Sequence, residues 1–151
     1  MQKSKKGFTL LEILVVITLI IIVAGITLPR FAGVADEGRK AKAHAELKTF
    51  QTALESYLLN NTSTVPATFA IAAVALEAAT PRLIGKTSTL YDPFLGNPIL
   101  YQYVASPNRK YYVVWSRGPN RVSEVTGIDN VGNLAPSPPG DDIFVTNGQL
   151  T

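Results

Sequence analysis

Cysteine is absent from this chain of 151 residues, and histidine occurs only once, at His44. The absence of cysteine excludes disulfide bonds, thiolate chemistry and cysteine-based zinc sites. With a single histidine, the sequence contains no Ser-His-acid set, and it has neither a metal-hydrolase motif nor a glycine-rich loop that could hold phosphate. We therefore expect a protein that is not an enzyme.

Clusters of positive charge are also scarce. The formal net charge is +3, but Lys3, Lys5 and Lys6 all precede Gly7 and account for this excess. No further block of Lys and Arg follows, and aromatic residues do not alternate with basic ones as they do on nucleic-acid-binding surfaces. The sequence therefore predicts no direct nucleic-acid partner.

The apolar residues, 46% of the chain, are concentrated near the N-terminus. The run at 8–28 follows the short basic stretch, and no charged residue occurs from Ile13 to Leu28. At about 1.5 Å per residue, a helix over this run reaches the roughly 30 Å thickness of the hydrocarbon core of a bilayer. The lysines before it favour a cytoplasmic location for that end. We expect one membrane-spanning helix.

Three interpretations of this run compete. A secretory signal peptide has an apolar region of only about 7–15 residues, which is shorter than this one. A plain membrane anchor fits the length but leaves Glu12 unexplained, because a carboxylate in an apolar helix costs about 2.5–3.5 kcal/mol on insertion scales. That acid could instead reach the membrane surface. In the third interpretation, processing of the N-terminus supplies a charged partner for Glu12.

The run GFTLLE at positions 7–12 resembles the processing site of the type IV pilin and type II secretion pseudopilin family. In that family a prepilin peptidase cuts after the glycine and methylates the new N-terminal amine. The resemblance therefore implies cleavage after Gly7 and N-methylation of Phe8. It also implies that Glu12 of one subunit pairs with the Phe8 amine of a neighbour, which would neutralise two charges that are costly in an apolar environment. Pro29 matches a family proline near the end of the membrane segment, and we include it among the assembly residues.

The helical pattern continues beyond the membrane segment to about Asn60. Leu47, Phe50 and Leu54 recur at three- and four-residue spacing, which predicts one apolar face that packs on a C-terminal head. Pro29 removes one backbone hydrogen bond from the helix. The result is either a mild kink or a stretch that unwinds in a filament, and the sequence leaves both open.

The rest of the chain predicts a small head with mixed structure. Residues 67–79 are rich in alanine and suit a short helix, residues 99–105 and 110–116 suit a β-hairpin, and residues 143–146 suit one more strand. The segment 117–142 is long and only weakly patterned. The predicted fold class is α+β: a long N-terminal helix, whose first half spans the membrane or forms a filament core, packed on a small antiparallel β-sheet head. We divide the chain into a cleavable leader at 1–7, a membrane helix at 8–29 and a head at 30–151.

The head narrows the resemblance to the major pseudopilin of type II secretion. The turn DPFLGNP at 92–98 is similar to a turn in that protein, with one extra residue at Leu95. The runs SRGPN at 116–120 and GDDI at 140–143 are similar to the two edges of its calcium-binding loop. An acid is usual in that family where Asn120 stands, and the loop here is longer.

The resemblance implies a calcium ion bound in this loop. Calcium takes about six to eight oxygen ligands. We expect carboxylates from Asp141 and Asp142, the amide oxygen of Asn120, and backbone carbonyls from Arg117 and Val122. Alternatively, the two aspartates are solvated turn residues.

Together, these features predict a structural subunit of a type II secretion pseudopilus. The expected partners are other copies in a helical filament, the prepilin peptidase, an inner-membrane assembly platform and other pseudopilins. The expected location is the bacterial inner membrane, with a single span and the head in the periplasm, followed by the assembled filament. The alternative is the major subunit of a surface type IV pilus used for adhesion, motility or DNA uptake, although many such pilins carry a C-terminal disulfide. A third possibility is a membrane-tethered enzyme or binding domain, which would require a pocket lined by several polar side chains.

Overall fold

The computed structural model describes residues 7–60, 64–79, 82, 84–85, 90–136 and 140–149, and only the backbone at 29–32. The predicted leader residues 1–6 and the side chain of Pro29 therefore lie outside the described part. The chain divides into two compact units, Met1–Glu37 and Gly38–Thr151.

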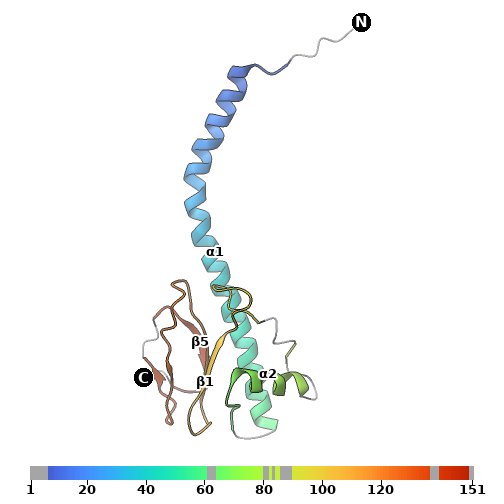
Figure 1. Ribbon diagram of the computed structural model, residues 1–151, viewed down its shortest axis with the longest axis vertical. Helices are drawn as coiled ribbons and strands as arrows, with labels where there is room; N and C mark the ends of the chain where they lie inside the picture. Colours follow the sequence, from blue (N-terminus) through green and yellow to red (C-terminus); the bar gives the residue numbers. More distant parts are fainter. Residues whose placement is uncertain are drawn as a thin grey trace. The chain divides into compact units, whose positions relative to one another are not determined.

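A single long helix occupies the N-terminal part of the chain. α1 runs from Leu10 to Asn60 over 51 residues, and its backbone stays helical at position 29 (Figure 1). Its last residue, Asn60, turns its side-chain amide back to donate to the Ser56 carbonyl at 2.9 Å. The predicted long helix and its end near Asn60 are confirmed.

In the second unit, α1 buries one face in the core of the head. Ala43, Leu47, Phe50 and Leu54 are all buried. Their three- and four-residue spacing places them on one side of the helix, so the amphipathic face predicted from the sequence is confirmed.

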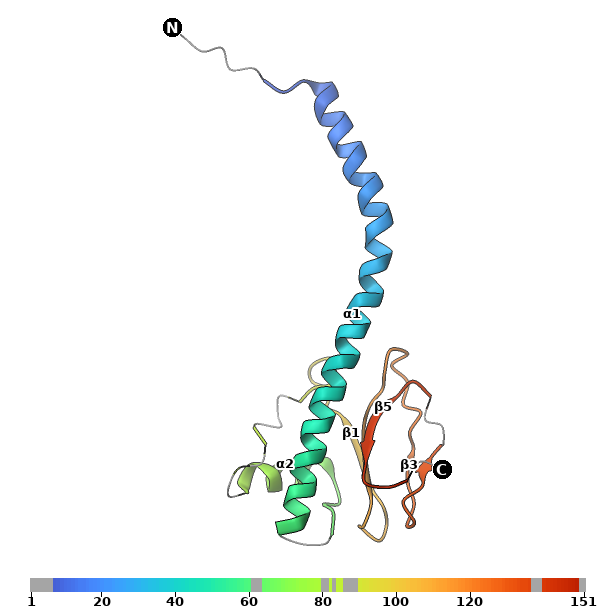
Figure 2. The same cartoon turned by 180° about the vertical axis from the view of Figure 1, so that it is seen from behind.

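The second helix, α2, runs from Phe69 to Ala78. The side chain of Thr68 caps it by accepting a hydrogen bond from the backbone N–H of Ile71 at 3.3 Å. The ring of Phe69 stacks on that of Phe50 in α1, with centroids 5.3 Å apart. In both ribbon views α2 lies on the side of α1 away from β5 (Figures 1 and 2).

The main sheet has three antiparallel strands in the order β1-β2-β5. β1 (Gln102–Ala105) and β2 (Tyr112–Ser116) form the predicted hairpin, and β5 (Ile143–Thr146) has the predicted bounds. β1 begins three residues later than expected, because Leu100 pairs only with Tyr91 in an isolated bridge.

The segment 117–142 differs from the expectation of an unpatterned loop. It contains β3 (Gly127–Ile128) and β4 (Leu134–Ala135), which pair antiparallel in a second small sheet. Strands of two residues are too short to show an alternating pattern, so no periodic signal predicts them.

Both faces of β2 are buried, and this divides the core into two layers. Tyr112 and Val114 pack with the residues of α1 and α2. Val113 and Trp115 point to the opposite face and pack with Val125, Ile128 and Leu134. The segment after β2 therefore folds back as a cover over the outer face of the sheet and brings its polar residues close to the start of β5.

Candidate assembly helix and metal site

The N-terminal motif places its acid in the first turn of α1. Thr9 precedes the helix, and its hydroxyl accepts a hydrogen bond from the backbone N–H of Glu12 at 3.2 Å. An acid in the first turn is favourable because it faces the positive end of the helix dipole. Gly7 and Phe8 lie before the helix and are exposed.

The helix beyond Glu12 has an uncovered apolar surface. Among the described residues, Leu10–Leu28 is the one segment long and apolar enough to cross a membrane, with a mean hydropathy of 2.8 over 19 residues and 0% of it buried. At about 1.5 Å per residue it is about 29 Å long. Side chains that are apolar on all sides of a helix require an apolar environment, either lipid or other helices.

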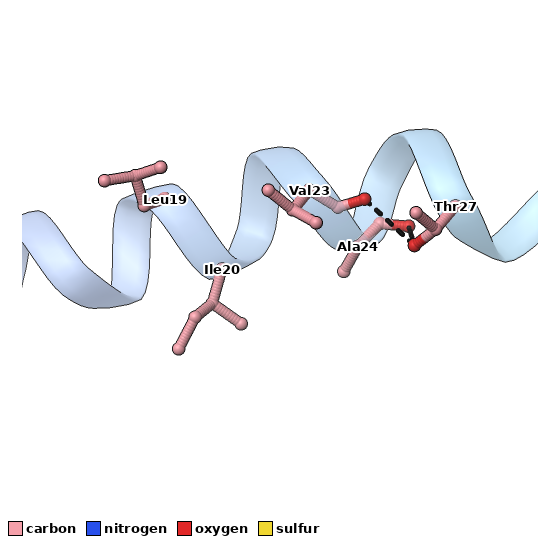
Figure 3. Close-up of a pocket in the computed structure, with 5 residues that line it drawn as sticks. All are labelled: Leu19, Ile20, Val23, Ala24 and Thr27. Carbon is pink, nitrogen blue, oxygen red and sulfur yellow. Dashed lines mark hydrogen bonds between the residues drawn. The ribbon is translucent and has the colours of Figure 1, made fainter.

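The hydroxyl groups in this segment are satisfied within the helix. Thr18 donates to the carbonyl of Leu14 at 2.8 Å, and Thr27 donates to the carbonyl of Val23 at 3.0 Å. Figure 3 shows Thr27 with its hydrogen bonds to the preceding turn, beside the apolar side chains of Val23 and Ala24. Because each hydroxyl has an internal acceptor, neither would be left unsatisfied in hydrocarbon.

Three carboxylates meet where β5 begins. Asp141 and Asp142 immediately precede β5, and Glu124 lies between β2 and β3. One carboxylate oxygen from each lies within 4.8 Å of the others. We call Glu124, Asp141 and Asp142 the acidic cluster.

Asp142 is the buried member of the acidic cluster and is only 7% exposed. Its Oδ2 accepts hydrogen bonds from the backbone N–H groups of Glu124 and Val125, both at 2.7 Å. Its Oδ1 is also buried, and it has no hydrogen-bond partner among the described residues. A buried acceptor without a partner is destabilising, so a cation beside this oxygen would remove a cost from the folded state.

The two other acids close the loop through hydrogen bonds. Glu124 Oε2 accepts from the backbone N–H of Asp141 at 2.7 Å, and Asp141 Oδ2 accepts from the backbone N–H of Asn120 at 3.0 Å. The Asn120 side chain donates to Glu124 Oε1 at 3.1 Å, and its Oδ1 accepts from the N–H of Val122 at 2.7 Å. Asn120 thus orients two of the three carboxylates.

Two glycines permit this close approach. Gly118 and Gly140 have φ values of +64° and +67°, which are unfavourable for residues with a side chain. A Cβ at Gly140 would collide with the Glu124 carboxylate, and one at Gly118 would collide with the Asp141 carbonyl. The backbone at both edges of the loop is therefore shaped around the acidic cluster.

Asp92 fixes the beginning of the same loop, where β2 ends. Its Oδ2 accepts from the backbone N–H of Arg117 at 2.9 Å, and its Oδ1 accepts from the hydroxyl of Ser116 at 2.8 Å and the N–H of Phe94 at 2.9 Å. This buried carboxylate joins the turn at 92–96 to the end of β2.

The structure thus brings the predicted ligands Asp141, Asp142 and Asn120 together, with Val122 hydrogen-bonded to Asn120. The backbone of Arg117 is tied to Asp92. Glu124 was missed by sequence reasoning, because it lies 17 residues before Asp141 and only folding of the loop brings the two together. The available signal was an acid four residues after Asn120, which could replace the carboxylate that Asn120 lacks.

The electrostatics of the acidic cluster favour a cation. Burial raises the pKa of Asp142, and the charges of Glu124 and Asp141 raise it further, although the two N–H donors to Oδ2 act in the opposite direction. A divalent cation would stabilise the ionised form of all three acids.

Comparison with known proteins identifies the N-terminal segment first. Residues 2–28 match the family described as the prokaryotic N-terminal methylation motif. Together with the long helix and the small antiparallel sheet, this motif makes the chain similar to type IV pilin-like proteins, as the sequence predicted.

Within that class, the chain is similar to type II secretion system core protein G, and the predicted resemblance to the major pseudopilin is confirmed. It is 37% identical over 60 residues to that protein of Klebsiella michiganensis, a match that covers 40% of this chain and only 42% of the relative. It is 29% identical over 140 residues to that protein of Pseudomonas aeruginosa, covering 88% of this chain and 95% of the relative. A fimbrial protein of Pseudomonas aeruginosa is 34% identical over 58 residues, 38% of each chain. No solved structure matches significantly.

Proposed function

We propose that this protein is a structural subunit of a type II secretion pseudopilus, which polymerises from the inner membrane and helps to drive protein export. The observation that carries the proposal is the 19-residue apolar segment Leu10–Leu28, none of which is buried, directly after a leader-processing motif. Such a surface suits lipid before assembly and neighbouring helices afterwards. The subunit itself performs no catalysis in this proposal.

The pseudopilus is favoured over a surface type IV pilus. The similarity to core protein G extends over nearly the whole chain, whereas that to the fimbrial protein covers 38% of it. The absence of cysteine also fits poorly with the C-terminal disulfide of many surface pilins. Deletion of the gene separates the two: exported proteins retained in the periplasm support the pseudopilus, and loss of surface fibres or twitching motility supports the pilus.

Assembly in this proposal follows cleavage after Gly7 by a prepilin peptidase and N-methylation of Phe8. The subunit crosses the inner membrane once, with its head in the periplasm, and joins other copies, other pseudopilins and an assembly platform. Glu12 then pairs with the Phe8 amine of a neighbouring copy, and Pro29 ends the filament-core segment. Position 12 in the first helical turn keeps the carboxylate close to the end of α1, where an amine of another copy could meet it.

Replacement of Glu12 tests the charge pair. Glu12→Gln removes the negative charge and keeps nearly the same shape, so the membrane-inserted monomer should remain while filament yield falls at least tenfold. Glu12→Asp keeps the charge and serves as the matched control, with yield closer to wild type. Filaments of Glu12→Gln at wild-type yield would show that the charge pair is not required.

The same proposal places a calcium ion at the acidic cluster. Asp141, Asp142 and Glu124 supply carboxylate oxygens, and the unpartnered Oδ1 of Asp142 has the burial and charge expected of a ligand atom. Asn120 would add an amide oxygen after its side chain turns, because its amide nitrogen now donates to Glu124 and its Oδ1 accepts from Val122. Arg117 and Val122 would add carbonyls. An all-oxygen set drawn from a loop suits calcium, which accepts six to eight ligands in flexible geometry, better than magnesium.

Thermal unfolding of the full-length protein in detergent tests the calcium site. A ligand that binds only the folded state stabilises it by about 2.7 kcal/mol at a hundredfold excess over its dissociation constant. Millimolar calcium should therefore raise the Tm, magnesium should raise it less, and Asp142→Asn and Glu124→Gln should abolish the rise. Glu55→Gln removes an exposed acid of α1 and should leave the rise unchanged. If calcium does not change the Tm of the wild type, Asp141 and Asp142 are solvated turn residues and not calcium ligands.

A further inference from the structure

Asn147 and Gly148, which directly follow β5, form the one Asn-Gly pair in the sequence. An asparagine is chemically labile when the backbone nitrogen of the next residue attacks its side-chain carbonyl carbon. Glycine hinders this attack least, because it has no Cβ and leaves the backbone free to adopt the required geometry. Asn147 is also exposed to water. This position therefore combines the most reactive neighbour with the water that completes the reaction.

Packing explains why both residues stand here. Asn147 Oδ1 accepts a hydrogen bond from the backbone N–H of Tyr112 at 2.9 Å, and its Nδ2 donates to the carbonyl of Lys110 at 2.9 Å. An amide supplies the acceptor and the donor that these two groups need, whereas a carboxylate supplies only acceptors. A Cβ at Gly148 would collide with the carbonyl oxygen of Gly132. The fold therefore favours a labile pair at this position for structural reasons.

The same contacts oppose the reaction in the folded head. The backbone N–H of Gly148 donates to the hydroxyl of Thr146 at 2.9 Å. That hydroxyl donates in turn to the carbonyl of Tyr112, which holds it in place. Attack on Asn147 requires the Gly148 nitrogen to lose its proton and the side-chain amide to turn toward it. Both movements break hydrogen bonds of the folded state, so the closed structure slows the reaction.

Opening of the segment 147–149 removes this protection. In the closed structure the N–H of Gln149 donates to the carbonyl of Gly132 at 2.7 Å, and Gln149 forms an isolated bridge with Asn133. These contacts attach the segment to the turn between β3 and β4. Strand ends and loops open at lower free energies than a whole domain. The segment therefore opens more often than the head unfolds, and the open state exposes the labile pair.

We propose that Asn147 is a site of spontaneous deamidation, which the native fold protects and which records opening of the segment 147–149. In the open state the Gly148 nitrogen forms a bond to Cγ of Asn147, and the side-chain amide nitrogen leaves as ammonia. The result is a cyclic succinimide. Water then adds to one of its two carbonyl carbons and breaks the ring C–N bond there, which yields isoaspartate or aspartate at position 147. No oxidant or reductant takes part.

The product cannot restore the closed structure. A carboxylate has no N–H to donate to the carbonyl of Lys110, and its negative oxygen would face that carbonyl instead. Isoaspartate also routes the backbone through the side chain and lengthens it by one carbon. Because ammonia is lost, the step does not reverse by itself. Each modified copy therefore keeps a weakened attachment between the end of β5 and the turn before β4.

Deamidation rates of folded and unfolded protein test the proposal directly. Full-length protein in detergent is incubated at mildly alkaline pH, with and without a denaturing concentration of guanidinium. Mass spectrometry of the peptide that contains Asn147 measures its mass gain and its isoaspartate content over time. We expect the folded protein to react at least tenfold more slowly than the unfolded chain. Equal rates in the two states would overturn the proposal.

A variant at Thr146 tests whether the hydrogen bonds at the site supply the protection. Thr146→Val keeps the branched shape and removes the acceptor of the Gly148 N–H, so the folded variant should deamidate at least threefold faster than the wild type. Thr49→Val is the matched control, because the Thr49 hydroxyl is exposed on α1 and donates only to the carbonyl of Ala45. A Thr146→Val rate no faster than that of Thr49→Val overturns the proposal.

Low concentrations of denaturant separate local opening from global unfolding. Below the unfolding transition the deamidation rate of the wild type should already rise, because the segment 147–149 opens first. A rate that rises only together with global unfolding, followed by circular dichroism, overturns the local-opening step. All of these measurements use unassembled protein, so their outcome does not depend on whether the chain forms a filament.

The product itself can be examined without waiting for the reaction. Asn147→Asp places the carboxylate directly at position 147 and should lower the Tm of the full-length protein. An unchanged Tm would contradict the weakened attachment of the modified chain.

Discussion

Tyr103 and Tyr112 lie side by side in the core, but only the Tyr103 hydroxyl has a hydrogen-bond partner among the described residues. Tyr103 and Tyr112 stack with ring centroids 6.3 Å apart, and burial raises the pKa of both phenols above their usual range. The Tyr103 hydroxyl donates to the carbonyl of Pro66 at 2.7 Å. The Tyr112 hydroxyl is buried and has no partner among the described residues.

Removing these two hydroxyls should therefore have different effects on stability. Tyr103→Phe loses a hydrogen bond and leaves the Pro66 carbonyl without its donor, so the free energy of unfolding should fall by about 1 kcal/mol. Tyr112→Phe removes an unsatisfied polar group and should leave that free energy unchanged or raise it. Chemical denaturation of each variant measures the change. A larger loss for Tyr112→Phe than for Tyr103→Phe would mean that the Tyr112 hydroxyl has a partner.

At the same scale, Asp142 should make stability depend on pH in the direction opposite to that of most aspartates. Its pKa in the folded protein lies above the ordinary value of 3.8, chiefly because it is buried. The ionised form is therefore disfavoured in the folded state. The contribution of Asp142 to stability is full below the unfolded pKa and is lost as pH rises through the folded pKa.

Comparison with Asp142→Asn isolates this effect from other titrating groups. In the presence of a chelator, the stability of the wild type relative to the variant should increase as pH falls from about 7 toward about 4. Bound calcium favours the ionised carboxylate and should reverse that trend. A relative stability that decreases with falling pH in the chelator would contradict the raised pKa.

At the scale of the elements, the start of α2 is stabilised by a side-chain cap. Only Thr68 supplies an acceptor to the first turn, at the N–H of Ile71, as far as the described residues show. Loss of an N-cap side chain typically costs about 1 kcal/mol. Thr68→Ala should lower the free energy of unfolding by about that amount.

Thr68→Ser keeps the hydroxyl and is the matched control for the cap. Its stability should stay close to that of the wild type. Equal losses for Ser and Ala would indicate that the methyl group of Thr68, rather than its oxygen, stabilises the start of α2. Both variants are measured by thermal unfolding of the full-length protein.

The strands were predictable to different degrees for a physical reason. β2 reads as an unbroken apolar run because both of its faces are buried, one against α1 and one against the segment that follows. Such a run is readable from the sequence alone. β3 and β4 have two residues each and are stabilised by packing on Val113 and Trp115, which no local pattern reports.

At the scale of the whole molecule, the proposed cleavage and N-methylation can be tested directly by mass spectrometry. The intact mass of protein from assembled filaments should correspond to residues 8–151 with one added methyl group. Gly7→Leu should block the cleavage and leave the full mass, because a bulky residue replaces the glycine of the processing motif. Filaments built from protein that retains residues 1–7 would contradict the cleavage proposal.

The sequence by itself determined the features that depend on local chemistry. A run of apolar residues at 8–28, the motif around Glu12 and the periodicity from Leu47 to Leu54 each act through neighbours along the chain. The long apolar helix, the family resemblance and the buried helix face could therefore be predicted from the sequence alone. The hairpin was predictable for the same reason, because its strands are adjacent and joined by a short turn.

Only the tertiary structure decided the features that join distant parts of the chain. The loop after β2 folds over the sheet and brings Glu124 to Asp141 and Asp142, which adds a third carboxylate to the predicted pair. Packing on one side of α2 leaves Ile71 and Val74 exposed on the other, although the helix is apolar apart from Glu77. In both cases burial and charge proximity arise from contacts between segments, and such contacts leave no periodic signal in either segment alone.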